Sequence, residues 1–156
     1  SIGAQALAQV LRGNLSKLTC INLNDNQVDN LGAISFAEAL KLNNYVKELS
    51  LKNNTIGTLG AKTLAQAIKI NNRLERLFLG RNCIGDAGAQ AFAVALKARA
   101  SQLVELNLQA NRIGRGGEAS LSKAMEFNLT MEKLATDRTI KTNDEKRRRM
   151  MIKSRV

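Results

Sequence analysis

Residues 74–84 read LERLFLGRNCI, and their spacing of leucine, asparagine and a final β-branched residue recurs three times in the 156-residue chain. The other copies are LTCINLNDNQV at 18–28, VKELSLKNNTI at 46–56 and LVELNLQANRI at 103–113. Their asparagines lie 28, 28 and 29 residues apart. A fixed period of this length indicates stacked repeats, each of which buries its apolar face against its neighbours. The sequence therefore predicts a solenoid, whose extended surface suits the binding of another molecule.

A second pattern follows these copies and predicts a helix in each repeat. It reads GAISFAEAL at 32–40, GAKTLAQAI at 60–68 and GAQAFAVAL at 88–96, with looser copies at 3–11 and 117–125. Apolar residues four apart form one helical face, and small alanines let that face approach the sheet. We expect each glycine to lie in the turn before its helix.

These two patterns set the expected element boundaries. We expect strands to start near Leu18, Val46, Leu74 and Leu103. We expect helices over 33–42, 61–70, 89–98 and 118–127. Three asparagines after the helices, Asn43, Asn71 and Asn128, are expected to form left-handed C-terminal caps.

The repeat resembles one subclass of leucine-rich repeats. The period, the L-x-x-L-x-L-x-x-N-x-I core and the G-A-x-x-L-A-x-A-L helix are similar to ribonuclease-inhibitor-type repeats over residues 3 to about 131. This subclass includes the ribonuclease inhibitors, the NOD-like receptors, the GTPase-activating protein of Ran and the C-terminal caps of tropomodulins. The resemblance implies an α/β fold: a leucine-rich repeat solenoid, or horseshoe arc, with a parallel sheet on the concave face and helices on the convex face.

The pattern decays toward the C-terminus, where Thr136 replaces a leucine and Thr139 replaces the asparagine. A terminal repeat must show water a polar outer face, so this decay is typical of a cap. We predict a leucine-rich repeat array over residues 1–140, with four full strand motifs and a degenerate last repeat. Residues 141–156 are predicted to form a basic C-terminal cap or tail.

The composition favours binding over catalysis. The chain has 24 Lys and Arg, 13 Asp and Glu, and no histidine, the commonest general base and metal ligand. No phosphate loop, paired-carboxylate motif or nucleophile elbow is found. We therefore predict a protein that is not an enzyme and has no cofactor and no metal site.

The cysteines and the hydropathy bear on the compartment. Cys20 and Cys83 are expected two strand spacings apart, about 10 Å, beyond the roughly 7 Å that a disulfide tolerates between Cα atoms. No apolar run reaches the roughly 20 residues needed to cross a bilayer. We predict a cytoplasmic protein, with association with the cytoskeleton left open.

The first residue is not a methionine and the helix at 3–11 has no repeat to cover it, so we expect either a monomeric array or a part of a larger chain or complex.

The repeated asparagines are predicted to be structural. In the resembled fold, an asparagine at this position turns inward and bonds backbone groups of the neighbouring repeat, which satisfies polar atoms that would otherwise be buried. This ladder consists of Asn26, Asn54, Asn82 and Asn111.

The residues that alternate with the inward leucines are predicted to face a partner, because successive strand residues point to opposite faces. They form three columns across the sheet. The first column is Cys20, Glu48, Arg76, Glu105 and Lys133; the second is Asn22, Ser50, Phe78, Asn107 and Ala135; the third is Asn24, Lys52, Gly80, Gln109 and Asp137. The charges of the first column alternate in sign, which fits either a self-satisfied ladder that keeps the sheet soluble or a partner site.

Phe78 is the one aromatic residue in these columns, with Arg76 and Arg81 nearby and Gly80 expected to leave a gap beside it. Aromatic and arginine side chains are enriched at binding hot spots. The alternative is that Phe78 covers the glycine or stacks with Arg76. Our candidate partner-binding residues are Glu48, Lys52, Arg76, Phe78, Arg81, Glu105 and Asn107.

The basic residues divide into two groups. Arg12, Lys41, Lys69 and Lys97 share one repeat position at the helix ends, where a cation offsets the helix dipole. The run Arg147, Arg148 and Arg149 lies in the tail and is typical of sites for phosphates, acidic proteins or anionic lipids.

Three functions are compatible with this sequence. The first is a non-catalytic protein–protein interaction module that binds through the concave face and adjacent loops. The second is binding to actin filaments or axonemes, which the tropomodulin resemblance implies. The third is binding of nucleic acid or a membrane surface through the basic tail, which lacks the stacking aromatics of single-strand binders.

Overall fold

The computed structural model describes residues 1–13, 16–98, 101–138 and 140. Helices and strands alternate along these residues in five units of one helix and one strand. The helices are α1 (Ile2–Arg12), α2 (Asn30–Leu42), α3 (Thr58–Ile68), α4 (Gly85–Leu96) and α5 (Arg115–Ala124). The strands are β1 (Cys20–Asn22), β2 (Glu48–Ser50), β3 (Arg76–Phe78), β4 (Glu105–Asn107) and β5 (Lys133–Ala135). We call each strand with the loop and the helix after it a coil, numbered by its strand.

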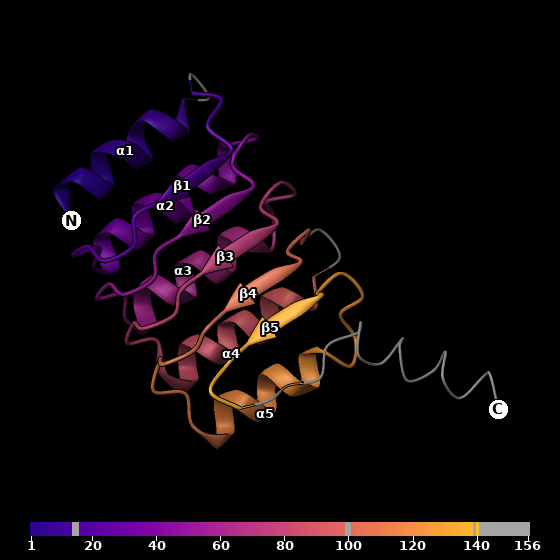
Figure 1. The fold of residues 1–156 in the computed structure, drawn as a ribbon. Helices are drawn as coiled ribbons and strands as arrows, with labels where there is room; N and C mark the ends of the chain where they lie inside the picture. Colours follow the sequence, from indigo (N-terminus) through magenta and orange to yellow (C-terminus); the bar gives the residue numbers. More distant parts are fainter. Residues whose placement is uncertain (14–15, 99–100, 139, 141–156) are drawn as a thin grey trace.

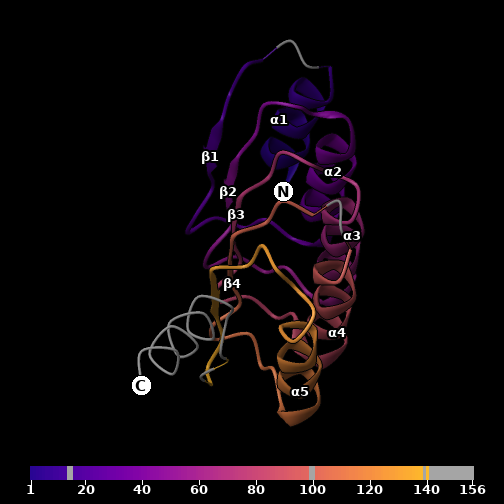
Figure 2. The same ribbon diagram turned by 90° about the vertical axis from the view of Figure 1, so that its right-hand side faces the viewer.

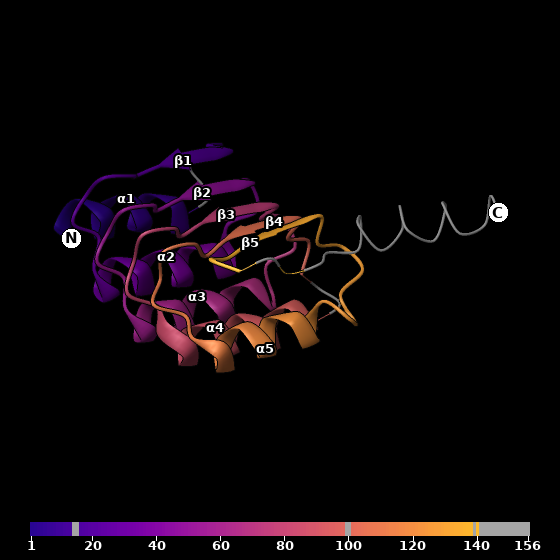
Figure 3. The same cartoon turned by 60° about the horizontal axis from the view of Figure 1, so that its bottom comes forward.

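The strands form a single parallel sheet in the order β1-β2-β3-β4-β5. Figure 1 shows the strands side by side, and Figure 2 shows all the helices on one side of the sheet. Figure 3 shows the coils stacked in sequence order. Each helix packs against the next one along the chain, as in a solenoid. The predicted α/β leucine-rich repeat fold is confirmed.

The element boundaries differ from those expected. The strands begin two residues later than expected, at Cys20, Glu48, Arg76 and Glu105. The helices begin three or four residues earlier, so that the glycines lie inside their first turns. A Cβ added at Gly88 would lie 2.3 Å from Ile84 Cγ2 and 3.1 Å from Ala61 Cβ. These glycines are therefore required for close packing between neighbouring helices, and the expected turn role is wrong.

The core between sheet and helices is aliphatic, with two phenylalanines. One inward leucine from each interior strand (Leu49, Leu77 and Leu106) is fully buried, as are Phe36 and Phe92 from the helices. Burial of a large apolar side chain stabilises a fold by about 1.5–3 kcal/mol. This repeated contribution holds the coils in register.

The last repeat keeps its strand but changes its core. β5 pairs with β4 in parallel, although its sequence departs from the motif. Glu118 occupies the repeat position of Ala33, Ala61 and Ala89, and is only 6 % exposed. Its Oε2 lies 3.0 Å from Thr136 Oγ1, and its Oε1 is buried without a hydrogen-bond partner. A buried polar pair thus replaces the alanine and leucine of the inner repeats.

No helix in the described ranges has the length and hydropathy to span a membrane. Cys20 and Cys83 are both free and exposed. The predicted boundary after residue 140 stays a prediction, since residues 141–156 lie outside the described residues.

Candidate functional site

The strand-loop asparagines of coils 2 to 4 each bond the coil before them. Asn82 Oδ1 accepts a hydrogen bond from Ile56 N at 2.9 Å, and its Nδ2 donates to Leu51 O at 2.9 Å. Asn54 bonds Val28 N and Leu23 O in the same way, and Asn111 bonds Ile84 N and Leu79 O. Each amide satisfies backbone groups that the stacked coils bury. These side chains face the interior and are not available to a partner.

Asn26 differs from the expected ladder. It is exposed, and its Nδ2 donates to Asn24 O in its own loop at 2.8 Å. It belongs to the first coil, so no described strand lies on its other side. The predicted contact with a neighbouring coil is therefore wrong at this position.

A second set of asparagines links the other ends of the coils. Asn43 Nδ2 donates to Leu11 O at 2.9 Å, while its Oδ1 accepts from Tyr45 N and Val46 N, both at 2.9 Å. Asn71 and Asn128 bond Leu40 O and Leu96 O of their preceding coils in the same way. Asn43 has φ −80° and ψ 130°, so the predicted left-handed cap is wrong. The sequence signal for these bonds between coils was the spacing of the asparagines, which follows the same repeat as the ladder.

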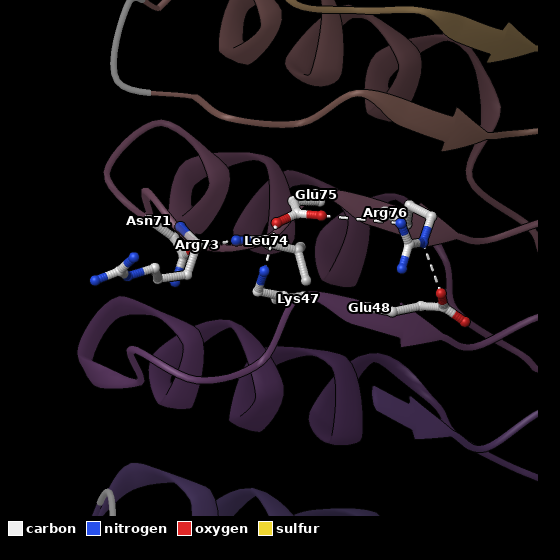
Figure 4. A network of polar contacts seen from close by, with 7 residues as sticks. All are labelled: Lys47, Glu48, Asn71, Arg73, Leu74, Glu75 and Arg76. Carbon is white, nitrogen blue, oxygen red and sulfur yellow. Dashed lines mark hydrogen bonds and ion pairs between the residues drawn. The ribbon is translucent and has the colours of Figure 1, made fainter. Parts of the chain in front are cut away.

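The first column of the concave face lies in the predicted register. Cα pairing aligns Cys20, Glu48, Arg76, Glu105 and Lys133 across the sheet. Arg76 Nε donates to Glu48 Oε2 at 2.7 Å, and Lys133 Nζ lies 2.7 Å from Glu105 Oε1. Figure 4 shows the pair of Arg76 and Glu48 and, beside it, the pair of Lys47 and Glu75, whose charged atoms lie 3.1 Å apart. The column is a ladder of ion pairs, and its charges are largely matched within the protein.

The ion pairs shift the titration of this column. The hydrogen bond from Arg76 holds the pKa of Glu48 below its ordinary value, and the same bond raises the pKa of Arg76. Loss of water around the sulfur, followed by the charge of Glu48, raises the pKa of Cys20. Cys20 Sγ lies 3.5 Å from Glu48 Oε1. The raised pKa of Cys20 disfavours the thiolate, which is the reactive form of cysteine.

Phe78 lies at the centre of the second column, between Ser50 and Asn107. Its side chain is half-buried on the outward face of the sheet. The expected gap at Gly80 is absent, since a Cβ there would lie 3.0 Å from Asn107 Oδ1. Arg76 directs its guanidinium to Glu48 and Glu75, and not over the Phe78 ring. Phe78 is thus an accessible apolar surface set among polar neighbours.

The third column leads into the loops that follow the strands. Lys52 and Arg81 are exposed there. The backbone N–H of Lys52 donates to Asn24 Oδ1 at 2.8 Å, which holds this loop against coil 1. Of the seven candidate residues, Glu48, Arg76, Phe78, Glu105 and Asn107 share the sheet face, while Lys52 and Arg81 lie at its edge.

The surface that the structure describes offers groups suited to recognition. In the part of the chain that the structure describes, no three His, Cys, Asp or Glu side chains gather as a metal site would require. The candidate run Arg147 to Arg149 lies outside the described residues. The concave face therefore combines fixed ion pairs, one aromatic ring and exposed cations, which are groups typical of protein-binding surfaces.

Comparison with known proteins agrees with this geometry. The family model described as the TMOD/LMOD leucine-rich domain matches residues 3–155. The structure titled "Leiomodin-1 Actin-Binding Site 2 (ABS2)" is similar to this chain, with a TM-score of 0.80 and 25% identity over 95% of this chain and 93% of that one. A tropomodulin C-terminal domain from Caenorhabditis elegans has a TM-score of 0.77 and 18% identity over 97% of both chains, a likeness of fold. No curated protein sequence matches. The family match covers nearly the whole chain, and the chain therefore belongs to the tropomodulin and leiomodin leucine-rich domain family.

Proposed function

We propose that this chain is a non-catalytic actin-binding module, which contacts actin through its concave face and the loops that follow the strands. The observation that carries the proposal is the likeness to a leiomodin domain titled as an actin-binding site, which extends over 95% of this chain. The family match over residues 3–155 supports it independently. A cytoskeletal location follows from this proposal.

The geometry supports the concave face as the binding surface. Phe78 presents a half-buried ring at the middle strand, where a partner would remove it fully from water. Aromatic anchors near the centre of an interface contribute most of the affinity when neighbouring groups exclude water. The ion pair of Arg76 and Glu48 beside it is already formed, so a partner would not have to order these two side chains.

The absence of histidine and the paired state of Glu48 and Glu105 support a binding role over catalysis. A general base needs a free carboxylate or imidazole within reach of a substrate. The two carboxylates are instead held by Arg76 and Lys133.

Co-sedimentation with filamentous actin tests the proposal, with binding to monomeric actin measured in parallel. Phe78→Ala should weaken the complex by about 1–2 kcal/mol, or roughly 5–30-fold. The matched control is Leu59→Ala, because Leu59 is 58 % exposed but lies on α3, away from the sheet. No binding of the wild-type chain to either form of actin would refute the proposal. Equal losses of actin affinity in Phe78→Ala and Leu59→Ala would indicate that the binding site does not lie on the concave face.

Replacement of Arg147, Arg148 and Arg149 by serine separates this function from binding of nucleic acid or a membrane surface. If the array holds actin, the variant should mainly change the association rate and its salt dependence, because distant charges steer encounters more than they hold complexes. Abolished binding in the tail variant, beside an unaffected Phe78→Ala variant, would place the site in the tail.

A further inference from the structure

The charge differs between the two ends of one edge of the solenoid, where the loops lead from each strand to its helix. We call this the strand-to-helix edge and define it by the equivalent loops 25–30, 53–58, 81–86 and 110–115, with residues 137 and 138 of the last coil. The first loop carries Asp25 and Asp29, and the second carries no charge. The third balances Arg81 with Asp86, and the fourth carries Arg112 and Arg115. The loop charges thus run −2, 0, 0 and +2, and Asp137 and Arg138 of the last coil sum to zero.

Hydrogen bonds hold these loops against one another. The backbone N–H of Asn53 donates to Gly80 O at 2.8 Å, and that of Arg81 donates to Gln109 O at 2.8 Å. The N–H of Ala110 donates to Asp137 Oδ1 at 2.7 Å, beside Arg138. Arg81, Arg112 and Arg138 therefore lie on three consecutive coils of one edge.

These three arginines lack partners of opposite charge. Each is exposed, and none forms an ion pair with any residue that the structure describes. The nearby acids are engaged with the backbone: Asp86 Oδ1 accepts from Gly114 N at 2.5 Å, and Asp137 Oδ1 accepts from Ala110 N. On the concave face, by contrast, Arg76 is paired with Glu48 at 2.7 Å. The edge thus presents three guanidinium groups without ion-pair partners among the described residues, while Asp86 and Asp137 nearby are held by backbone N–H groups.

The backbone at the start of this turn is left-handed in each of coils 1 to 4. Arg81 has φ 57°, and the equivalent residues Asp25, Asn53 and Ala110 have φ 57°, 54° and 55°. Arg112, in the same turn as Ala110, also has φ 57°. The conformation at Arg81 therefore belongs to the repeat, and a substitution there must suit a left-handed residue, as asparagine and aspartate do.

We infer that this edge binds a carboxylate-bearing segment of a protein partner, with Arg81, Arg112 and Arg138 as the contacting groups. A guanidinium pairs with a carboxylate through two parallel N–H···O bonds, so arginine at these sites selects for that group more sharply than lysine would. The opposite, acidic end of the edge fixes the partner's direction by repulsion. The inference rests on the proposed function, since it takes the partner to be a protein and adds which surface of it is recognised.

The first test measures filamentous-actin affinity of the full chain with Arg81→Asn, Arg112→Asn and Arg138→Asn combined. Asparagine suits the left-handed positions, and Asn53 already stands at one equivalent site. The matched control combines Lys62→Gln, Lys69→Gln and Lys123→Gln, which removes three charges from exposed sites on or next to the helices. The arginine variant should bind at least about tenfold more weakly, and the lysine variant within about twofold of wild type. Equal losses, or no loss in the arginine variant, would overturn the inference.

The second test does not depend on actin. Hexaglutamate is titrated into the ¹⁵N-labelled chain while the arginine Nε–H resonances are followed by NMR. Signals of Arg81, Arg112 and Arg138 should shift, and those of Arg12 and Arg73 should not. If these shifts occur but wild type does not bind actin, the proposed function fails and the edge site stands. Uniform shifts of all arginines, or equal shifts with an oligonucleotide of the same charge, would show general anion binding and overturn the inference.

Discussion

Leu77 and Phe78 are neighbours on the same strand, yet Leu77 belongs to the buried core and Phe78 to the outward face of the sheet. Leu77, which faces the helices, is fully buried, and leucine occupies the same position in β2 and β4. Phe78 faces outward, and its counterparts are Ser50 and Asn107. The inward positions repeat because each must fit the coil beside it. The outward positions vary from strand to strand because they face away from the core between sheet and helices.

The inward region should respond most strongly to truncation. Leu77→Ala removes a fully buried side chain and leaves a cavity, so unfolding free energy should fall by about 2–5 kcal/mol. Phe78→Ala, one residue away, should cost less than half as much, because its ring is half-buried. Chemical denaturation of both variants measures the difference. Similar losses would mean that Phe78 belongs to the core.

Asn82 and Asn26 allow the buried and the exposed regions to be compared within one residue type. Asn82→Ala leaves Ile56 N and Leu51 O without their partner, and should destabilise by about 1–3 kcal/mol. Asn26→Ala should cost under about 0.5 kcal/mol, since its amide is exposed. The measurement is the denaturation midpoint of each variant. An equal destabilisation by Asn26→Ala would mean that the Asn26 side chain contributes to stability despite its exposure.

The register of the repeats was predictable from sequence because each repeat makes the same contacts with its neighbours. The three columns and the ladder at Asn54, Asn82 and Asn111 follow directly from the spacing. Asn26 was not predictable in this way, since its environment depends on what stands beside the first coil. A repeat pattern describes positions, while the ends of an array depend on neighbours that the pattern does not contain.

The finer features of the surface were predicted less well, because they depend on side-chain volume in three dimensions. Gly80 reads as a gap in the sequence, but the Asn107 amide fills that space. Gly88 reads as a turn residue, but its role is contact with Ala61 of the preceding helix. The left-handed backbone at Arg81 is signalled only by its repeat equivalents Asp25 and Asn53, and that at Arg112 has no such signal, since arginine is not typical of this conformation.

The last coil offers a stabilising change. Glu118→Ala combined with Thr136→Leu restores the alanine and leucine of the inner repeats and removes the unpartnered Glu118 Oε1. Unfolding free energy should rise by about 1 kcal/mol, at the low end of the cost of an unsatisfied buried polar group. Thermal denaturation checks this. A loss of stability would mean that the polar pair is part of how the array ends.

The ion pairs on the outward face should contribute least to the unfolding free energy, and only at pH values where Glu48 is ionised. Because the folded-state pKa of Glu48 is lowered from 4.5, its contribution is present above about pH 4.5 and is lost as the pH falls through the folded value. Glu48→Gln should therefore cost under about 1 kcal/mol at neutral pH, and less below pH 4.5. Urea denaturation of wild type and variant at several pH values gives the difference. A pH-independent cost would assign the effect to packing.

The central claim is that the inward residues build the array and the outward concave face binds the partner. Hydrogen–deuterium exchange of the full chain, with and without filamentous actin, tests it most directly. The prediction is that actin slows exchange in the peptides that contain β3 and the loop at 79–84, and leaves the peptides of α3 and α4 unchanged. Protection confined to α3 and α4, or to neither region while actin is bound, would contradict it.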